Sequence, residues 1–174
     1  MPDAAPLRLE APWDRGHVLI TVLVTTLCLA GALLTGWAVL EAPDTVRRAL
    51  AGAAFCVCAG TPLLAWLLAP VAFTVEPGRL TVHRRLWPLR FEGVTGARPV
   101  DPYLVAGALR VLGSGGVFGR YGRFQHVVLG RFTLYARRRE GTVALATAKG
   151  TVVVAPSDPE AAVRIVGERR SEAA

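Results

Sequence analysis

Two long stretches without a formal charge dominate the first part of the chain. Val18 to Leu40 covers 23 residues, and Ala49 to Val75 covers 27. A helix needs about 20 mostly apolar residues to cross roughly 30 Å of hydrocarbon. Both stretches are long enough, and the short segment between them contains Pro43, which suits a tight turn. The pattern predicts an N-terminal cytoplasmic tail over residues 1–17 and a two-helix transmembrane hairpin over residues 18–75.

After the second stretch the pattern changes to the alternation of strands. Ala72 to Glu76 and Leu80 to His83 flank the turn dipeptide Pro77-Gly78, which predicts a β-hairpin that leaves the membrane directly. Leu89 to Phe91 is a candidate third strand. We therefore expect residues 76–174 to form a cytoplasmic domain.

The later part of this domain predicts three more strands and a helix. The strands are Arg131 to Arg138, Thr142 to Thr147 and Thr151 to Ala155, and tight turns between them predict a meander. Ser157 and Glu160 fit a capping box, Pro159 fits a first helical turn, and Ala162, Ile165 and Val166 form an apolar helical face that ends near Arg170. Antiparallel strands followed by one helix predict a small barrel or bent sandwich closed by that helix. The absence of βαβ alternation argues against a doubly wound nucleotide fold.

The charge of this domain indicates which partners it can bind. The chain carries a net charge of +7, and the residues after Val75 carry 16 basic against 8 acidic side chains. Beside a bilayer, each basic residue contributes on the order of 1 kcal/mol to attraction by anionic headgroups. Nucleic acid is another usual partner of basic domains, but a membrane tether disfavours it. Six basic residues flank the spans on the tail side and two lie in the loop, which predicts a multi-pass inner (plasma) membrane protein with both termini cytoplasmic.

The segment from Gly113 to Phe124 ends in three copies of Gly-x-aromatic. It does not match a phosphate-binding loop, because Phe118 occupies a required glycine position and no Gly-Lys-Ser/Thr follows. An RNA-binding segment, a membrane-dipping loop and an internally packed special turn remain as interpretations. If the segment meets the membrane, the candidate phosphate contacts are Arg84, Arg85, Arg120 and Arg123, and the candidate interface contacts are Phe118 and Tyr121.

Catalytic and metal-binding patterns are not found. The three cysteines, Cys28, Cys56 and Cys58, all lie in the apolar stretches, so no disulfide framework is expected after residue 75. The histidines, His17, His83 and His126, show no metal-ligand spacing, and neither paired carboxylates nor a nucleophile elbow is present. The uncharged spans also argue against transport. We expect a non-enzymatic protein without cofactor or metal.

Several motifs together resemble the bacterial pleckstrin-homology (PH)-like domain membrane protein family. They are Gly113 to Gly119, Arg123-Phe124, Leu129 to Phe132, Tyr135-Ala136 and Ala155 to Pro159. The resemblance covers roughly residues 72–166 and is strongest over 113–159. It implies a two-helix transmembrane hairpin followed by a mainly-β PH-like barrel with a C-terminal α-helix, and it implies no reaction.

Two functional hypotheses follow. The first is a membrane-anchored, non-enzymatic PH-like binding module that contacts anionic phospholipid headgroups at the cytoplasmic membrane surface. The alternative is a membrane-tethered scaffold that recruits a protein partner through the PH-like domain. Small residues at helix-packing spacing, such as Ala32 with Gly36 and Cys56 with Gly60, fit either packing within the hairpin or a homo-oligomer.

Overall fold

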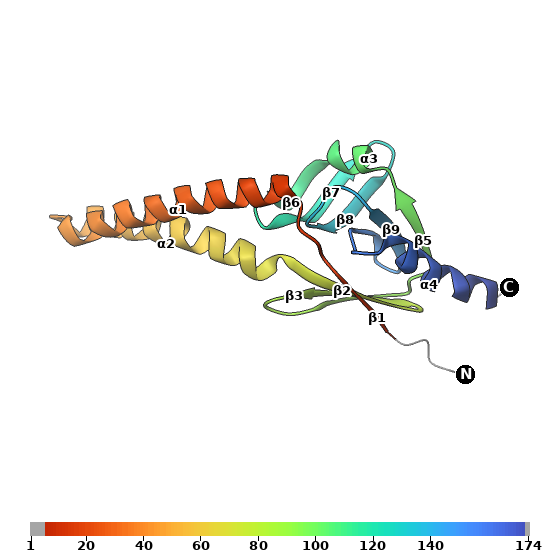
Figure 1. Ribbon diagram of the computed structural model, residues 1–174. Coiled ribbons are helices and arrows are strands. Elements are labelled where there is room, and N and C mark those ends of the chain that lie inside the picture. Colours follow the sequence, from red (N-terminus) through yellow and green to blue (C-terminus); the bar gives the residue numbers. More distant parts are fainter. Residues whose placement is uncertain (1–5, 173–174) are drawn as a thin grey trace.

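Two long antiparallel helices project from a β-rich domain (Figure 1). The computed structural model describes residues 6–172, and it places α1 at Arg15–Glu41 and α2 at Thr45–Leu68. Both helices are long and apolar enough to cross a membrane, and only 11% and 6% of their most apolar windows are buried. Core helices of soluble proteins are mostly buried, so the exposed apolar surface supports a membrane-associated protein.

The two helices pack closely where Gly31 and Gly36 of α1 face α2. A Cβ added at Gly31 would lie 3.1 Å from the Cys58 sulfur, and one added at Gly36 would lie 3.4 Å from the Phe55 ring. Glycine at these two positions lets the helix backbones approach each other. Gly52 and Gly60 on α2 have nothing within 4 Å of such an atom. The small residues at 31 and 36 therefore serve packing within the hairpin.

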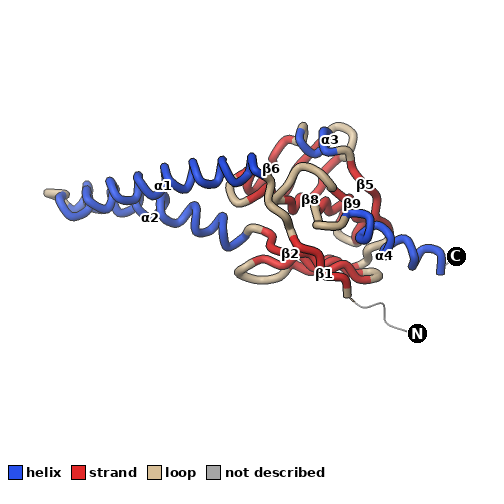
Figure 2. The backbone as a smooth tube through the Cα atoms, in the orientation of Figure 1, coloured by secondary structure: helices blue, strands red, loops and turns tan. Residues whose placement is uncertain are grey.

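The β-domain contains two sheets. The first has the order β1-β2-β3-β4, all antiparallel, and the second has the order β5-β9-β10-β8-β7-β6. Figure 2 shows the strands gathered at one end of the molecule, with the helical hairpin outside them. The elements are β1 (Leu7–Glu10), β2 (Pro70–Glu76), β3 (Arg79–Arg84), β4 (Leu89–Glu92), β5 (Gly96–Val100), α3 (Pro102–Ala106), β6 (Leu109–Gly116), β7 (Gly119–His126), β8 (Gly130–Ala136), β9 (Thr142–Thr147), β10 (Gly150–Val154) and α4 (Pro159–Glu172).

The main core lies between the inner faces of the two sheets. Alternate residues such as Phe73 and Leu80 from the first sheet meet Leu145 and Val152 from the second, and all are at most 2% exposed. Ala162 on α4 packs into the same core, so this helix closes the barrel. The expected architecture of two apolar helices, then a mainly-β domain with a C-terminal helix, is confirmed.

The N-terminal segment takes part in the first sheet. Leu7 to Glu10 pairs along β2, and the Ala11 N–H donates to the Val71 carbonyl at 3.0 Å. The second uncharged stretch divides at Leu68, where α2 ends and β2 soon begins. The expected division between residues 75 and 76 therefore cuts through β2, and a domain starting at residue 76 lacks two strands. Residues 1–5 and 173–174 lie outside the described residues.

The predicted meander is wrong. Strand β10 lies between β8 and β9, parallel to β8 and antiparallel to β9. The other edge of β9 pairs with β5, so the chain crosses over after β8 instead of folding back beside it. Turn residues at 140–141 indicate that the chain changes direction there, but they do not indicate which strand will be the neighbour.

The predicted cap of the C-terminal helix is also wrong by one residue. The Asp158 carboxylate accepts a hydrogen bond of 3.0 Å from the Ala161 N–H, so Asp158 caps α4. The Ser157 N–H instead donates to the Glu10 carbonyl at 2.9 Å. This bond ties the start of α4 to β1.

Candidate functional site

The glycine-aromatic segment forms the hairpin of β6 and β7. Gly113 pairs with Gly122, and Gly116 pairs with Gly119 at the tight turn. Phe118 in this turn has a φ of 57°, in the left-handed region. The hairpin tip lies beside the start of α1 (Figure 1).

Two hydrogen bonds and one ring contact hold this hairpin against the long helices and the residues just before α1. The Phe118 N–H donates to the Thr21 hydroxyl of α1 at 2.8 Å, and the Phe118 ring meets the Trp13 ring edge-on at 6.4 Å between centroids. The Tyr121 hydroxyl donates to the Ala65 carbonyl of α2, also at 2.8 Å. Burial raises the pKa of Tyr121, so its hydroxyl stays protonated as a donor. The hairpin therefore joins the two long apolar helices to the barrel.

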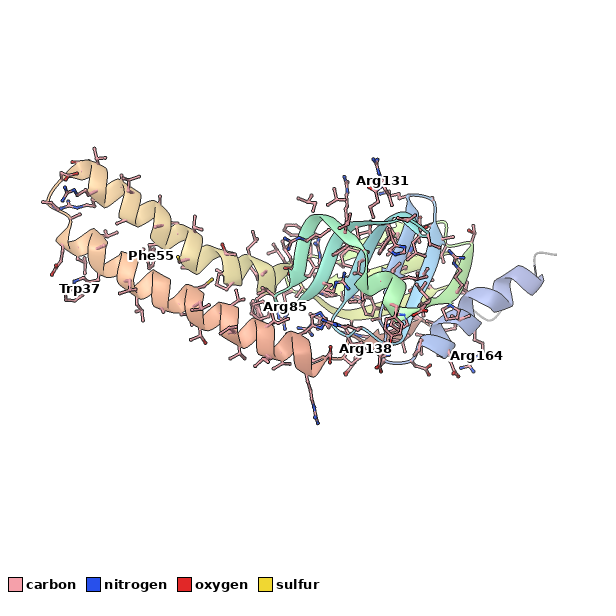
Figure 3. All side chains as sticks on the ribbon, turned by 90° about the horizontal axis from the view of Figure 1, so that it is seen from above. Trp37, Phe55, Arg85, Arg131, Arg138 and Arg164 are labelled. Carbon is pink, nitrogen blue, oxygen red and sulfur yellow. The ribbon has the colours of Figure 1, made fainter. Side chains whose placement is uncertain are left out.

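The last carbonyl groups of α2 are satisfied by the β-domain. Arg85 donates to the Trp66 carbonyl at 3.1 Å, and its guanidinium lies 4.4 Å from the centre of the Trp66 ring. The Leu86 N–H donates to the Leu67 carbonyl at 3.3 Å. The end of a helix has unpaired carbonyls and a partial negative charge, and the arginine offsets both. Figure 3 shows Arg85 where the helices meet the domain.

Tryptophans mark both ends of the helical pair. Trp13, Trp66 and Trp87 lie at the domain end, and each stacks with an arginine. Trp37 lies near the far end of α1 (Figure 3). Tryptophan favours the two membrane–water interfaces, so tryptophans at both ends of the helical pair support membrane association.

One of these stacked arginines is buried. Arg137 is 4% exposed and lies 4.0 Å from the centre of the Trp13 ring. Its Nε and Nη2 atoms have no hydrogen-bond partner among the described residues. Burial, with a smaller contribution from the charge of Arg85, lowers the pKa of Arg137 to about 10.

A hollow of about 560 Å³ opens between the start of α1 and the β6–β7 hairpin. We call it the α1–β6 hollow. Its polar and charged lining comes from His17 on α1, Arg110 and Ser114 on β6, Arg120 on β7, and Arg139 after β8. Among the residues that line it, every formal charge is positive. Ile20 adds an apolar wall from α1.

Among the described residues, the arginines of this hollow have no acidic partner. Within the described part of the chain, no carboxylate lies within 4 Å of the guanidinium of Arg110, Arg120 or Arg139. Arg120 stacks on the Phe124 ring at 5.2 Å, and burial followed by the charge of Arg139 lowers its pKa. His17 is buried and lies 3.5 Å from the Asp14 carboxylate, one turn earlier. The hollow therefore collects positive charge that an anion would offset.

The six residues singled out from the sequence lie in four places. Arg120 lines the α1–β6 hollow, and Arg84 and Arg85 lie at the end of α2, where Arg84 stacks on Trp87 at 5.3 Å. Phe118 is partly buried and Tyr121 is 7% exposed, which matches the internally packed interpretation of the segment. Arg123 is exposed. It lies three residues after Arg120 on β7, and because successive side chains alternate between faces, it faces the other side of the strand.

Sequence reasoning missed His17, Arg110 and Arg139 as members of one site. They come from a helix, a strand and a loop far apart in the chain, and no local motif connects them. Within the residues described, no group of three or more His, Cys, Asp or Glu side chains is placed to hold a metal ion.

Residues 91–169 match the family model described as bacterial PH domain. The match runs from β4 into α4, so the resemblance read from the sequence is confirmed over this segment. The two long helices and strands β1 to β3 lie outside the match. None of the curated proteins and none of the solved structures matches the chain.

Proposed function

We propose that this protein is a membrane-anchored, non-enzymatic binding module whose α1–β6 hollow takes the phosphate headgroup of an anionic phospholipid. The observation that carries the proposal is a hollow bordered by the first turns of α1 and lined by three arginines that have no acidic partner among the described residues. Bacterial PH domains, the family matched by residues 91–169, are generally non-catalytic binding modules.

The position of the hollow favours a lipid over a soluble anion. His17 and Ile20 line the hollow from the turn of α1 that contains Val18, where the apolar stretch begins. With the helices in a bilayer, this level is that of the headgroups. A lipid there would place its phosphate against the arginines and its chains along the exposed apolar surface of α1.

The chemistry of the lining also suits a phosphate. Arginine presents a planar set of donors that pairs bidentately with phosphate oxygens. The Ser114 hydroxyl also lines the hollow; it donates to the Val117 carbonyl at 2.8 Å and would turn from this carbonyl to donate to a phosphate. Because burial already disfavours the charge of Arg120, an anion in the hollow would gain more from pairing there than at an exposed site.

The direction of the hairpin in the membrane belongs to this proposal. Both ends of the pair enter from the side of the β-domain, and basic residues are more numerous there than in the loop, which carries Arg47 and Arg48. The positive-inside rule then places the domain and both termini in the cytoplasm.

The test uses the full chain in bilayer nanodiscs of phosphatidylcholine with a minor fraction of phosphatidylglycerol. Native mass spectrometry of the extracted protein would count retained phosphatidylglycerol at physiological salt. We expect retention by the wild type and its loss in an Arg110→Gln, Arg139→Gln double variant. Arg98→Gln with Arg131→Gln is the matched control, because both residues are exposed and lie outside the hollow. Equal retention by both double variants would refute the lipid site.

A second candidate is the scaffold. Strand β6 is an edge strand of its sheet, and it exposes Leu109, Val111 and Leu112. Exposed apolar edge strands are sites where another chain can pair. If this function holds, replacing Val111 by Lys would abolish co-purification of a protein partner and leave phosphatidylglycerol retention unchanged.

A further inference from the structure

A second hollow, of about 400 Å³, lies on the outer face of the first sheet. The strand register places four of its residues in one row across the sheet. Arg8 on β1 pairs with Thr74 on β2, Thr74 pairs with Thr81 on β3, and Thr81 pairs with Arg90 on β4. Because successive side chains alternate between faces, and Leu9, Phe73, Leu80 and Phe91 point into the core, all four face outward together.

The row puts two hydroxyls between two guanidinium groups. Three strand spacings of about 4.8 Å separate the Arg8 and Arg90 backbones, and both side chains line the same hollow. Beside the row, His83 lies within 2.8 Å of the Thr74 hydroxyl through its Nε2 atom. Hydrogen-bonding side chains from four strands therefore line one hollow on the surface.

The nearby carboxylates do not neutralise the two end arginines. Glu76 and Glu92 lie 3.8 and 3.3 Å from Arg79, the third arginine of the hollow. Arg8 and Arg90 have no ion pair within 4 Å among the residues that the structure describes. An excess of positive charge remains at the row itself.

This hollow is separate from the proposed lipid site. The two share no lining residue. Thr74 lies four residues beyond Pro70, where β2 begins after α2, and a rise of about 3.3 Å per residue carries it roughly 13 Å along the strand. The ligand of such a site comes from the aqueous side of the headgroups.

We propose that Arg8, Thr74, Thr81, Arg90 and His83 form a second anion site that takes a water-soluble phosphate monoester. Each end arginine offers a bidentate contact to phosphate oxygens, and the two threonine hydroxyls lie between them as further hydrogen-bonding groups. A phosphate monoester carries more negative charge than a singly charged anion such as nitrate, so two guanidinium groups without acidic partners among the described residues favour it. The site would give the domain a response to a soluble phosphorylated compound that is independent of the lipid.

Calorimetric titration of the full chain in phosphatidylcholine nanodiscs tests this site, with glycerol 3-phosphate and inorganic phosphate as probes and nitrate as the negative probe. We expect saturable binding of both phosphates, at least tenfold weaker binding by Arg8→Gln or Arg90→Gln, and a smaller loss for Thr74→Val. Arg98→Gln, on β5 and outside the hollow, should bind as the wild type does. Absence of saturable binding, or equal binding by the Arg8 and Arg98 variants, would overturn the proposal.

A second arm separates this site from the lipid site. Introducing Arg110→Gln with Arg139→Gln should leave the affinity for glycerol 3-phosphate in phosphatidylcholine nanodiscs unchanged. A tenfold loss would mean that the soluble phosphate occupies the α1–β6 hollow, and the second site would be rejected. Unchanged melting temperatures of the variants would show that each loss is a loss of binding and not of folding.

Discussion

The Tyr121 hydroxyl donates a hydrogen bond of 2.8 Å to the Ala65 carbonyl, which joins strand β7 to the last turn of α2. The acceptor lies 56 residues earlier in the chain. This bond attaches the end of α2 to the barrel. The hairpin that carries Tyr121 is therefore in direct contact with the helix end.

Removing this hydroxyl should lower stability without changing the fold. Tyr121→Phe leaves a carbonyl at the helix end without its partner, which costs about 1–3 kcal/mol. Thermal unfolding of the full chain in detergent, followed by circular dichroism, measures the effect. Tyr103→Phe is the control, because Tyr103 is 85% exposed. Equal melting temperatures for the two variants would show that the bond to Ala65 contributes nothing.

The pair Gly113 and Gly122 should not tolerate a side chain. A Cβ at Gly113 would lie 2.1 Å from the Tyr121 carbonyl oxygen, and one at Gly122 would lie 2.1 Å from that of Leu112. Both residues also have a φ near +124°. We expect alanine at either position to destabilise the protein by about 2 kcal/mol or more.

The control for this pair is Gly96→Ala on β5, where nothing lies within 4 Å of an added Cβ. Chemical denaturation in detergent measures all three variants. If Gly113→Ala unfolds at the same denaturant concentration as Gly96→Ala, the strands are not held as closely as the contact distance indicates.

Replacing Asp158, which caps α4, should lower stability more than replacing its neighbour Ser157. Asp158→Ala removes the acceptor for the Ala161 N–H and should cost about 1 kcal/mol. Ser157→Ala should have almost no effect, because the bond from Ser157 to Glu10 uses the main-chain N–H. Equilibrium unfolding of the two variants checks this order. A larger loss for Ser157→Ala would restore the capping box expected from the sequence.

Replacing the buried Arg137 by methionine should leave the protein as stable or make it more stable. Burial lowers the pKa of Arg137 to about 10, so the folded state holds this charge at a cost throughout neutral pH. The cost falls only as the pH rises above about 10, where the folded state releases the proton first. Methionine keeps a long side chain against Trp13 without the unpaired Nε and Nη2 groups.

Thermal unfolding at neutral pH checks this expectation, with Arg164→Met on the exposed side of α4 as the control. Figure 3 shows Arg164 on that helix, away from the long helices. A melting temperature well below that of the control would mean that stacking of the guanidinium on Trp13 outweighs the cost of burying it.

The pKa of His83 should depend on the charge of Arg8. Burial, followed by the charge of Arg8, lowers the pKa of His83. The folded state then binds fewer protons than the unfolded state below about pH 6.5, so His83 reduces stability as the pH falls through that value. Arg8→Gln should raise the pKa by removing one of the two causes. Nuclear magnetic resonance titration of the imidazole measures it, and Arg98→Gln is the control.

Sulfate provides the matching test of binding. In the second hollow, on the outer face of the first sheet, four charged residues lie around His83: Arg8 from β1, Glu76 from β2, Arg79 from β3 and Arg90 from β4. An anion there favours the protonated imidazole, so sulfate, whose charge is constant in this range, should bind more tightly as the pH falls from 7.5 to about 5.5. His83→Gln should remove this dependence. A wild-type affinity that does not change with pH would exclude His83 from the site.

The sequence by itself determined those elements that local pattern defines. A charge-free run of sufficient length predicts α1 and α2 because the membrane requires about 20 apolar residues. Period-two alternation located β2, β3, β8, β9 and β10 within a few residues, and the glycine-aromatic run indicated the family that residues 91–169 match. These features depend on near neighbours in the chain.

The tertiary structure alone decided how the elements pair and which side chains meet. The strand of residues 7–10, the insertion of β10 between β8 and β9, and the contact of Tyr121 with Ala65 all join segments far apart in sequence. The same holds for Arg110, Arg120 and Arg139, which share one hollow only because a hairpin and a loop meet the start of α1. Alternation reports which face of a strand is buried, but it does not report the partner of that face. Pairing and convergence follow from packing of the whole chain, where each contact is selected together with all the others.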